Sequence, residues 1–146
     1  GMYAMESLRL EKSYRMWGMD LTKEYSILEA GLDRFVKIQK GQFTGREALL
    51  LQRESGVPQE FITLEVDVDD ADPMGNEPVF SGNEMIGRAT SGCYGHSVGK
   101  SLALAYVESG TGRVGTELEL EILDKRYPAR VIEESPCDPQ NEKLRV

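Results

Sequence analysis

Apolar and polar residues alternate in short runs over the second part of the chain. In residues 61–68, Ile62 and Leu64 fall on one side of an extended segment, so this strand is expected to bury one face. Residues 116–122 alternate leucine or isoleucine with glutamate in the same way. Further apolar runs between turn residues lie at 77–80, 85–89, 102–107 and 127–132. Short strands at this spacing predict a small antiparallel barrel or sandwich, and Pro128 predicts an edge strand.

A helical pattern comes before the strands. Residues 4–17 repeat apolar and aromatic residues at helix-like spacing and stop at Gly18, which predicts an amphipathic helix. Arg9 and Glu11 would point about 200° apart on that helix. One of them is therefore expected to turn inward, where it needs a partner. Glu11 and Arg15 also have the spacing of a surface ion pair.

Residues 22–56 predict shorter elements. Thr22 is a candidate cap for a short second helix, and residues 35–38 alternate as in a strand. Thr44 and Glu47 have the spacing of a capping box at the start of a third helix. That helix is expected to end at Gly56, because glycine favours the backbone conformation found just beyond a helix.

The stretch that organises the sequence is residues 84–107. Two apolar runs, 85–89 and 102–107, flank a polar loop with three glycines and the only histidine. Glycine permits positive φ or close approach of another group, so the stretch predicts a rigid scaffold that presents a loop. The alternative, which the composition alone favours, is a long connection between strands without function. The loop residues in question are Gly92, Cys93, Tyr94, Gly95, His96 and Gly99.

Composition and charge exclude several classes of function. The chain has 146 residues, of which 40% are hydrophobic and 29% charged, a globular composition. The net charge is −8, and residues 56–146 carry all of the negative excess, so nucleic acid is not expected as a partner. The sequence has no apolar run near the ~18 residues of a membrane helix. We therefore expect no membrane partner.

Metal sites and catalytic sets are not expected either. Two cysteines and one histidine are too few for a zinc site, and Cys93 and Cys137 are expected to be free thiols rather than a disulfide. Residues 67–72 are acidic like a calcium loop, but they lack its glycine and its closing glutamate. A Cys93–His96 pair is the sole candidate for nucleophilic catalysis, and we assign no catalytic residue.

Three long stretches occur in an order that is characteristic of one family. They are SLRLEKSYRMWGMDLT, LEAGLDRFVKIQKGQFTGREAL and IGRATSGCYGHSVGKSLALAYV. Together they resemble the carboxy-terminal part of the glycine cleavage T-protein (aminomethyltransferase) superfamily. The RLEKSYRMWG and SGCYGHSVGKSLALAYV forms are most similar to the tetrahydrofolate-handling modules of dimethylglycine and sarcosine dehydrogenases. The resemblance covers nearly the whole chain.

The resemblance implies an α+β fold in two parts. Residues 1–55 would be the end of the folate-binding domain, and residues 58–146 a complete antiparallel β-barrel. Family members bind tetrahydrofolate and transfer a one-carbon unit from a small methylamine or aminomethyl donor. The implied location is the cytoplasm, or the mitochondrial matrix in a eukaryote.

The same resemblance implies the site residues. The arginine of the RLE motif, Arg9, would face the folate, while the barrel loop would lie near the rim of its site. A structural ion pair for Arg9, with Glu11 as its partner, stays open, as does an anchoring role for Trp17 and a backbone contact for His96. The candidate folate-binding residues are Arg9, Glu11, Tyr14, Trp17, Tyr94 and His96.

The sequence also lacks parts that the family uses. The amino-terminal half of the folate-binding fold is absent from it, as is the domain that carries FAD in the dehydrogenase relatives. We therefore expect the chain by itself to be inactive. The alternative is a non-catalytic barrel that mediates assembly, in which residues 1–55 expose an apolar face and drive self-association.

Overall fold

The computed structural model describes residues 1–143 and residue 145. It contains two α-helices, two short 3-10 helices and six strands, in the α+β arrangement that was expected. The elements in chain order are α1 (Met2–Glu11), η1 (Asp33–Phe35), η2 (Ile38–Lys40), α2 (Arg46–Ser55), β1 (Gln59–Val66), β2 (Pro78–Ser81), β3 (Glu84–Gly95), β4 (Lys100–Glu108), β5 (Glu117–Ile122) and β6 (Lys125–Ile132).

The six strands form a closed antiparallel barrel in the order β1-β4-β3-β2-β5-β6, which confirms the prediction of a small barrel. Strand β1 pairs with β4 along its whole length, from Gln59 opposite Glu108 to Val66 opposite Ser101. The narrowest seam joins β2 to β5, where only Val79 and Phe80 have partners in the ladder. The long pairs β1–β4 and β3–β4 therefore form the main wall.

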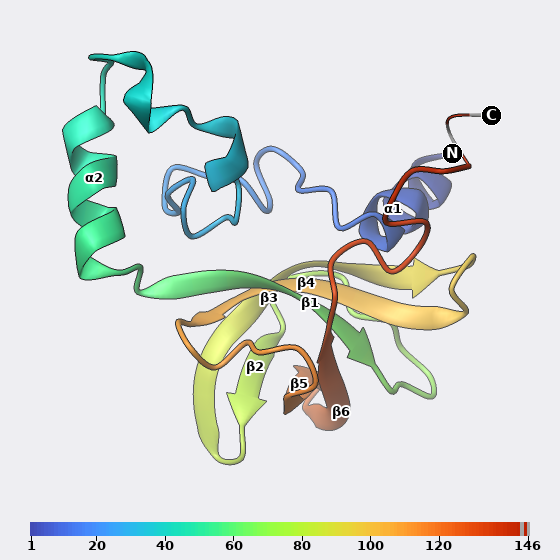
Figure 1. Cartoon of the computed structure of the whole chain (residues 1–146). Coiled ribbons are helices and arrows are strands. Elements are labelled where there is room, and N and C mark those ends of the chain that lie inside the picture. Colours follow the sequence, from blue (N-terminus) through green and yellow to red (C-terminus); the bar gives the residue numbers. More distant parts are fainter. Residues whose placement is uncertain (144, 146) are drawn as a thin grey trace.

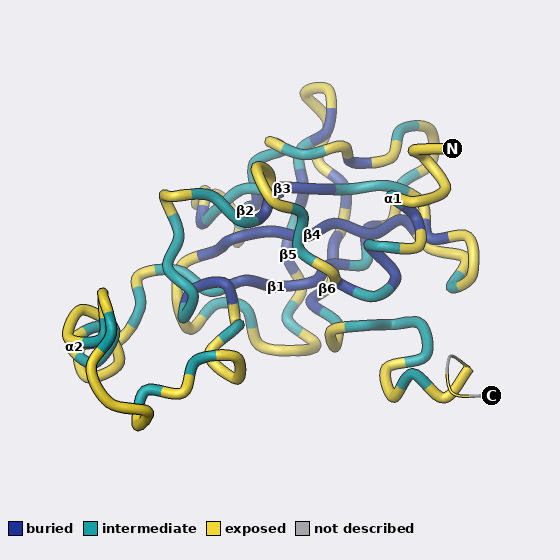
Figure 2. The backbone as a smooth tube through the Cα atoms, turned by 90° about the horizontal axis from the view of Figure 1, so that it is seen from above, coloured by how far each residue is buried: buried dark blue, intermediate teal, exposed yellow. Residues whose placement is uncertain are grey.

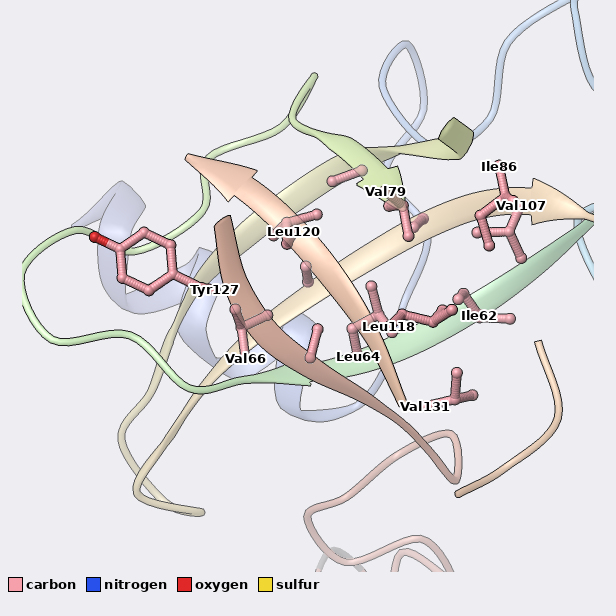
Figure 3. Packing of buried hydrophobic residues seen from close by; sticks show 14 of the residues in the cluster. Ile62, Leu64, Val66, Val79, Ile86, Val107, Leu118, Leu120, Tyr127 and Val131 are labelled. Atoms are coloured by element: carbon pink, nitrogen blue, oxygen red, sulfur yellow. The ribbon is translucent and has the colours of Figure 1, made fainter. Parts of the chain in front are cut away.

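Alternation places one side of each strand inside the barrel, as the sequence pattern predicts. Figure 3 shows these apolar side chains pointing toward a common interior. Tyr127 reaches its margin and donates its hydroxyl hydrogen to Asp70 Oδ1 at 2.6 Å. The labelled interior residues are Ile62, Leu64, Val66, Val79, Ile86, Val107, Leu118, Leu120, Tyr127 and Val131.

The outer face of β1 and β4 is also buried, because the amino-terminal segment lies across it (Figures 1 and 2). Leu10 of α1 and Ala30 pack there against Leu102, Leu104 and Tyr106 of β4. The central residues of β4 are thus buried on both faces. A strand covered on both sides reads as a continuous apolar run, which is what the sequence shows at 102–107.

Helix α2 stands away from the barrel in both views (Figures 1 and 2). It ends as expected at Gly56, whose φ is +83°. The predicted capping box is wrong, because Gly45 is the N-cap and neither Thr44 nor Glu47 bonds to the cap. Ala48, Leu49 and Leu51 of α2 line an open groove with Ile27.

Three local predictions in residues 4–38 are wrong. Helix α1 ends at Glu11, six residues before the expected end, because the backbone turns at Ser13 with φ of +51°. The Ser13 hydroxyl bonds with Thr63 Oγ1 in the barrel at 2.9 Å, so a tertiary contact stops the helix. Thr22 caps a bend rather than a helix. Residues 35–38 end one 3-10 helix and begin the next instead of forming a strand.

Two predictions within the barrel are also corrected. Most of the expected glycine loop is strand: β3 continues through Gly95 and pairs with β4 as far as Lys100. Only residues 96–99 form the turn. Pro128 does not mark an edge, since β6 pairs with both β5 and β1. Its carbonyl accepts a hydrogen bond from the Asp67 amide at 2.9 Å. Proline lacks an N–H but keeps its carbonyl, so it can still take part in this pairing.

Candidate functional site

Arg9 is largely enclosed by groups of its own chain. Its side chain is 10% exposed, and its Nη1 donates to Asp20 Oδ2 at 2.8 Å and to the Tyr14 carbonyl at 3.0 Å. Its Nε and Nη2 both donate to Glu6 Oε2. Four of the five guanidinium hydrogens are thereby used, and one Nη2 hydrogen has no partner among the described residues.

Glu11 is also buried, at 1% exposure, so the two charged residues that diverge on the helix are both withdrawn from water. Glu11 Oε1 accepts the amide hydrogen of Ser97 in the β3–β4 turn. The expectation that Glu11 pairs with Arg9 or Arg15 is wrong. Arg9 takes Glu6 and Asp20, while Arg15 pairs with Glu134.

Tyr94 and His96 reach the same region from the barrel. Ser7 Oγ donates to the Tyr94 carbonyl at 2.8 Å and accepts from the His96 amide at 3.2 Å. The two rings meet edge to face, with centroids 5.1 Å apart. Ser7 of helix α1 therefore bonds to the backbone at the end of β3. The side chains of Tyr94 and His96 stay exposed.

The aromatic residues after α1 face outward. Tyr14 is 52% exposed and Trp17 is 80% exposed, so Trp17 is not a core residue of this chain. The turn that carries Trp17 is nevertheless tightly bonded, since the Met16 carbonyl accepts from the amides of Asp20 at 2.9 Å and Leu21 at 3.0 Å. A flat, exposed ring on a fixed turn is suited to stacking against a ligand or a partner.

Sequence reasoning missed the residue that connects these groups. Asp20 is 0% exposed and bonds to Arg9, to the Met16 amide, and to the hydroxyls of Thr90 and Ser91. Its carbonyl accepts from the Tyr106 hydroxyl at 2.8 Å. Burial, and then the Asp20 charge, raise the pKa of Tyr106. The sequence shows Asp20 only as a turn residue, and no periodic signal distinguishes it.

The thiols and carboxylates do not form a reactive set in the described residues. No group of three histidine, cysteine, aspartate or glutamate side chains in residues 1–143 and 145 is placed to hold a metal ion. Cys93 and Cys137 are free. Burial, with the nearby Glu6 and Asp72 carboxylates, raises the pKa of Cys93 from 9.0 to about 11. Its thiol is therefore protonated and a poor nucleophile near neutral pH.

Comparison with known families assigns both parts of the chain. Residues 59–138 match the model described as "Glycine cleavage T-protein C-terminal barrel domain". The chain belongs to the glycine cleavage T-protein family. Residues 1–40 match that family's "GCVT N-terminal domain". The family assignment thus agrees with the resemblance drawn from the sequence motifs.

Relatives in the T-protein family cover nearly the whole chain but are much longer. Mitochondrial dimethylglycine dehydrogenase of Rattus norvegicus is 44% identical over 92% of this chain and 16% of that protein. Aminomethyltransferase of Moorella thermoacetica is 41% identical over 90% of this chain and 36% of that protein. The crystal structure of glycine cleavage system aminomethyltransferase T from Bartonella henselae superposes with a TM-score of 0.87. It is 26% identical and covers 95% of this chain and 39% of that chain.

The T-protein family is folate-dependent, so the candidate residues can be tested against a folate. Trp17 and Tyr14 offer exposed aromatic faces for its flat ring, and Arg9 offers one N–H. Glu11 fits less well, because its carboxylate is buried under the Ser97 amide.

The helices in the described part of the chain are too short or too polar to span a bilayer.

Proposed function

We propose that this chain is the carboxy-terminal module of a tetrahydrofolate-dependent enzyme of the aminomethyltransferase or dimethylglycine dehydrogenase type. In that module, residues 1–55 complete the folate-binding domain and residues 58–146 form the barrel domain. The observation that carries the proposal is the match over 92% of the chain to dimethylglycine dehydrogenase, at 44% identity. Such a protein would work in the cytoplasm, or in the mitochondrial matrix of a eukaryote.

The residues of the proposed site have distinct tasks. Trp17 and Tyr14 would stack on the folate ring, and the free Nη2 hydrogen of Arg9 would bind one of its acceptor atoms. Tyr94 and His96 would lie at the rim, while Glu11 would hold the β3–β4 turn. A ligand that meets a single N–H and two rings gains one charge-assisted hydrogen bond, worth about 1–3 kcal/mol, beside the stacking contacts. The isolated chain is therefore expected to be inactive and to bind folate weakly.

A chimaeric enzyme tests this proposal. The matched 132 residues of the Moorella thermoacetica aminomethyltransferase are replaced by this chain. Tetrahydrofolate binding is measured by calorimetric titration, and methylenetetrahydrofolate formation by absorbance. Both activities are expected in the chimaera and neither in the isolated chain at high micromolar folate.

Substitution of Trp17 then tests the residue assignment. Trp17→Ala in the chimaera should weaken folate binding by roughly tenfold, since stacking on an aromatic ring contributes about 1–3 kcal/mol. Leu123→Ala is the matched control, because Leu123 is similarly exposed but lies on the β5–β6 hairpin. A folded chimaera that binds no tetrahydrofolate would overturn the proposed function.

A second candidate function, assembly through residues 1–55, has a specific observation in its favour. Apolar side chains on α1 and the turn after it are exposed, among them Tyr3, Leu8 and Trp17. Several large apolar side chains exposed on one short segment are typical of a contact surface. Light scattering over a range of protein concentrations should then show reversible self-association, and a monomer at every concentration would exclude it.

A further inference from the structure

Asp20 has more bonding partners than a turn residue needs. Its Oδ2 accepts from Arg9 Nη1 at 2.8 Å and from the Met16 amide at 2.7 Å. Its Oδ1 accepts from the hydroxyls of Thr90 and Ser91, the second at 2.8 Å. The carboxylate is completely buried, so it joins helix α1, its own turn and strand β3 without competition from water.

The two hydroxyls reach Asp20 because β3 is irregular at this point. Successive residues of a regular strand point to opposite faces, so Thr90 and Ser91 should not meet one carboxylate. The pairing with β4 shifts between Ala89 and Ser91. A β-bulge of this kind re-aims side chains and is frequent beside functional sites. Here it turns both hydroxyls toward Asp20.

The same carboxylate fixes the turn that carries Trp17. Oδ2 binds the Met16 amide, and the Asp20 backbone is held at both ends, by the Met16 carbonyl and by the Tyr106 hydroxyl. Arg9 and the Trp17 turn are thus attached to one point on the barrel wall. If Asp20 served only to neutralise Arg9, the bonds to Met16, Thr90 and Ser91 would be superfluous.

From these contacts we infer that Asp20 is a positioning residue, which fixes the Arg9 guanidinium and the backbone of the turn that carries Trp17 to β3 before any ligand arrives. Pre-organisation of this kind lowers the entropic cost of binding. Its use for a folate rests on the proposed function. The positioning itself is a property of this chain and is testable without ligand.

Asp20→Asn is the informative variant, because it keeps the shape and removes the charge. The amide oxygen can face Arg9 and the Met16 amide, and its NH₂ can face hydroxyls that rotate to accept. Thr90 Oγ1 already lies 3.3 Å from the Leu104 carbonyl, to which it can then donate. The variant is therefore expected to fold with its Arg9 contact weakened.

Two measurements report how firmly Trp17 and Arg9 are positioned, independently of whether the chain is folded. Trp17 is the single tryptophan, so time-resolved anisotropy follows its turn directly. Asp20→Asn should raise the amplitude of the fast nanosecond component above its wild-type value, with acrylamide quenching unchanged. In ¹⁵N spectra the Arg9 Nη1 and Nη2 resonances should be separate in wild type and merge in the variant, as rotation about the guanidinium bonds speeds up.

The control variants distinguish the contact of Asp20 with Arg9 from its contacts with the hydroxyls of Thr90 and Ser91. Asp72→Asn removes a carboxylate contact to Ser101 Oγ elsewhere on the barrel and should change neither readout. The double variant Thr90→Val and Ser91→Ala should make the Trp17 turn more mobile while the Arg9 resonances stay separate. This double variant also tests the role of Asp20 if Asp20→Asn does not fold. Anisotropy and resonances unchanged in the folded variants would overturn the inference. A chain that shows these changes but whose chimaera binds no folate would count only against the proposed function.

Discussion

Arg9 and Glu11 show how two charges on one helix can both leave the solvent. Arg9 is neutralised by Asp20 and Glu6, whereas Glu11 is held by the Ser97 amide at the turn of the barrel. Removing one partner of a buried ion pair costs about 3–5 kcal/mol, because the other charge stays buried. Substitution of Arg9 would therefore disturb folding as well as any ligand contact, and Trp17 is the cleaner probe of function.

Alkylation of Cys93 tests the electrostatics around α1. Because burial and the Glu6 and Asp72 carboxylates raise its pKa to about 11, only the rare thiolate can react near pH 8. In a Cys137→Ser background, iodoacetamide should react about a hundredfold more slowly than with a thiol of pKa 9, with a pH–rate midpoint near 11. Glu6→Gln should lower that midpoint, and a midpoint near 9 in wild type would contradict the assignment.

The same shift has a consequence for stability. The folded state keeps the Cys93 proton to a higher pH than the unfolded state does, so its contribution is complete below about pH 9 and is lost as the pH rises toward 11. Urea unfolding should show this loss between pH 9 and 11. The loss should be smaller in Cys93→Ala, the control, whose remaining decline above about pH 10 comes from the raised pKa of Tyr106.

Gly87 is required by close approach of two strands. A Cβ atom at this position would lie 2.1 Å from the Tyr106 carbonyl oxygen of β4. Gly87→Ala should therefore lower the free energy of unfolding by about 3 kcal/mol or more, because backbone atoms must move. Gly110→Asn is the control, since nothing lies within 4 Å there and asparagine tolerates positive φ. Equal losses in the two variants, measured by urea unfolding, would refute the explanation.

At the scale of elements, α1 acts as a clamp on the β3–β4 turn. Ser7 and Glu11, one helical turn apart, bind the backbone of Tyr94, His96 and Ser97. The Glu11 carbonyl also accepts from the Cys137 amide at 3.0 Å, which adds the carboxy-terminal segment. Three parts of the chain therefore meet on the last turn of one short helix.

Glu11→Ala should release this clamp. Loss of the carboxylate leaves the Ser97 amide without its partner, at a cost of about 1–3 kcal/mol, and amide exchange at Ser97 should accelerate. Glu11→Gln keeps an acceptor oxygen and should lose less stability. If Glu11→Ala matched wild type in both urea unfolding and amide exchange, the contact between Glu11 and Ser97 would contribute nothing to the free energy of unfolding.

The sequence predicted those elements whose signal is local. Period-two alternation marked β1 and β5, and Gly56 marked the end of α2. The end of α1 escaped prediction because it depends on Ser13 meeting Thr63, 50 residues away. The strand through 90–95 was hidden by its glycines, which read as a loop although Gly92 packs tightly against Pro73. The importance of Asp20 arises only once β3 and α1 are brought together.

At the scale of the whole molecule, stability is unevenly distributed. The barrel and the segment on its outer face share two buried clusters, while α2 has no buried residue and projects from them (Figure 1). A ten-residue helix without such support is marginal in water. The part between residues 33 and 56 is expected to open independently of the barrel.

Hydrogen exchange should separate these two regions. Amides of α2 are expected to exchange at rates close to those of a free peptide, because their opening requires no loss of core contacts. Amides of β4, buried on both faces, should exchange only through global unfolding. Protection of α2 equal to that of β4 would show that the helix is stabilised by contacts beyond those described.

Closure of the sheet restricts how other proteins can attach to this one. Each of the six strands already has a neighbour on both sides, so no strand of the barrel is open along its whole length to an incoming peptide that would add a seventh strand. Recognition must then act through side chains and turns. The same closure disfavours fibril growth by strand addition, because each added copy would first have to open its short β2–β5 pairing.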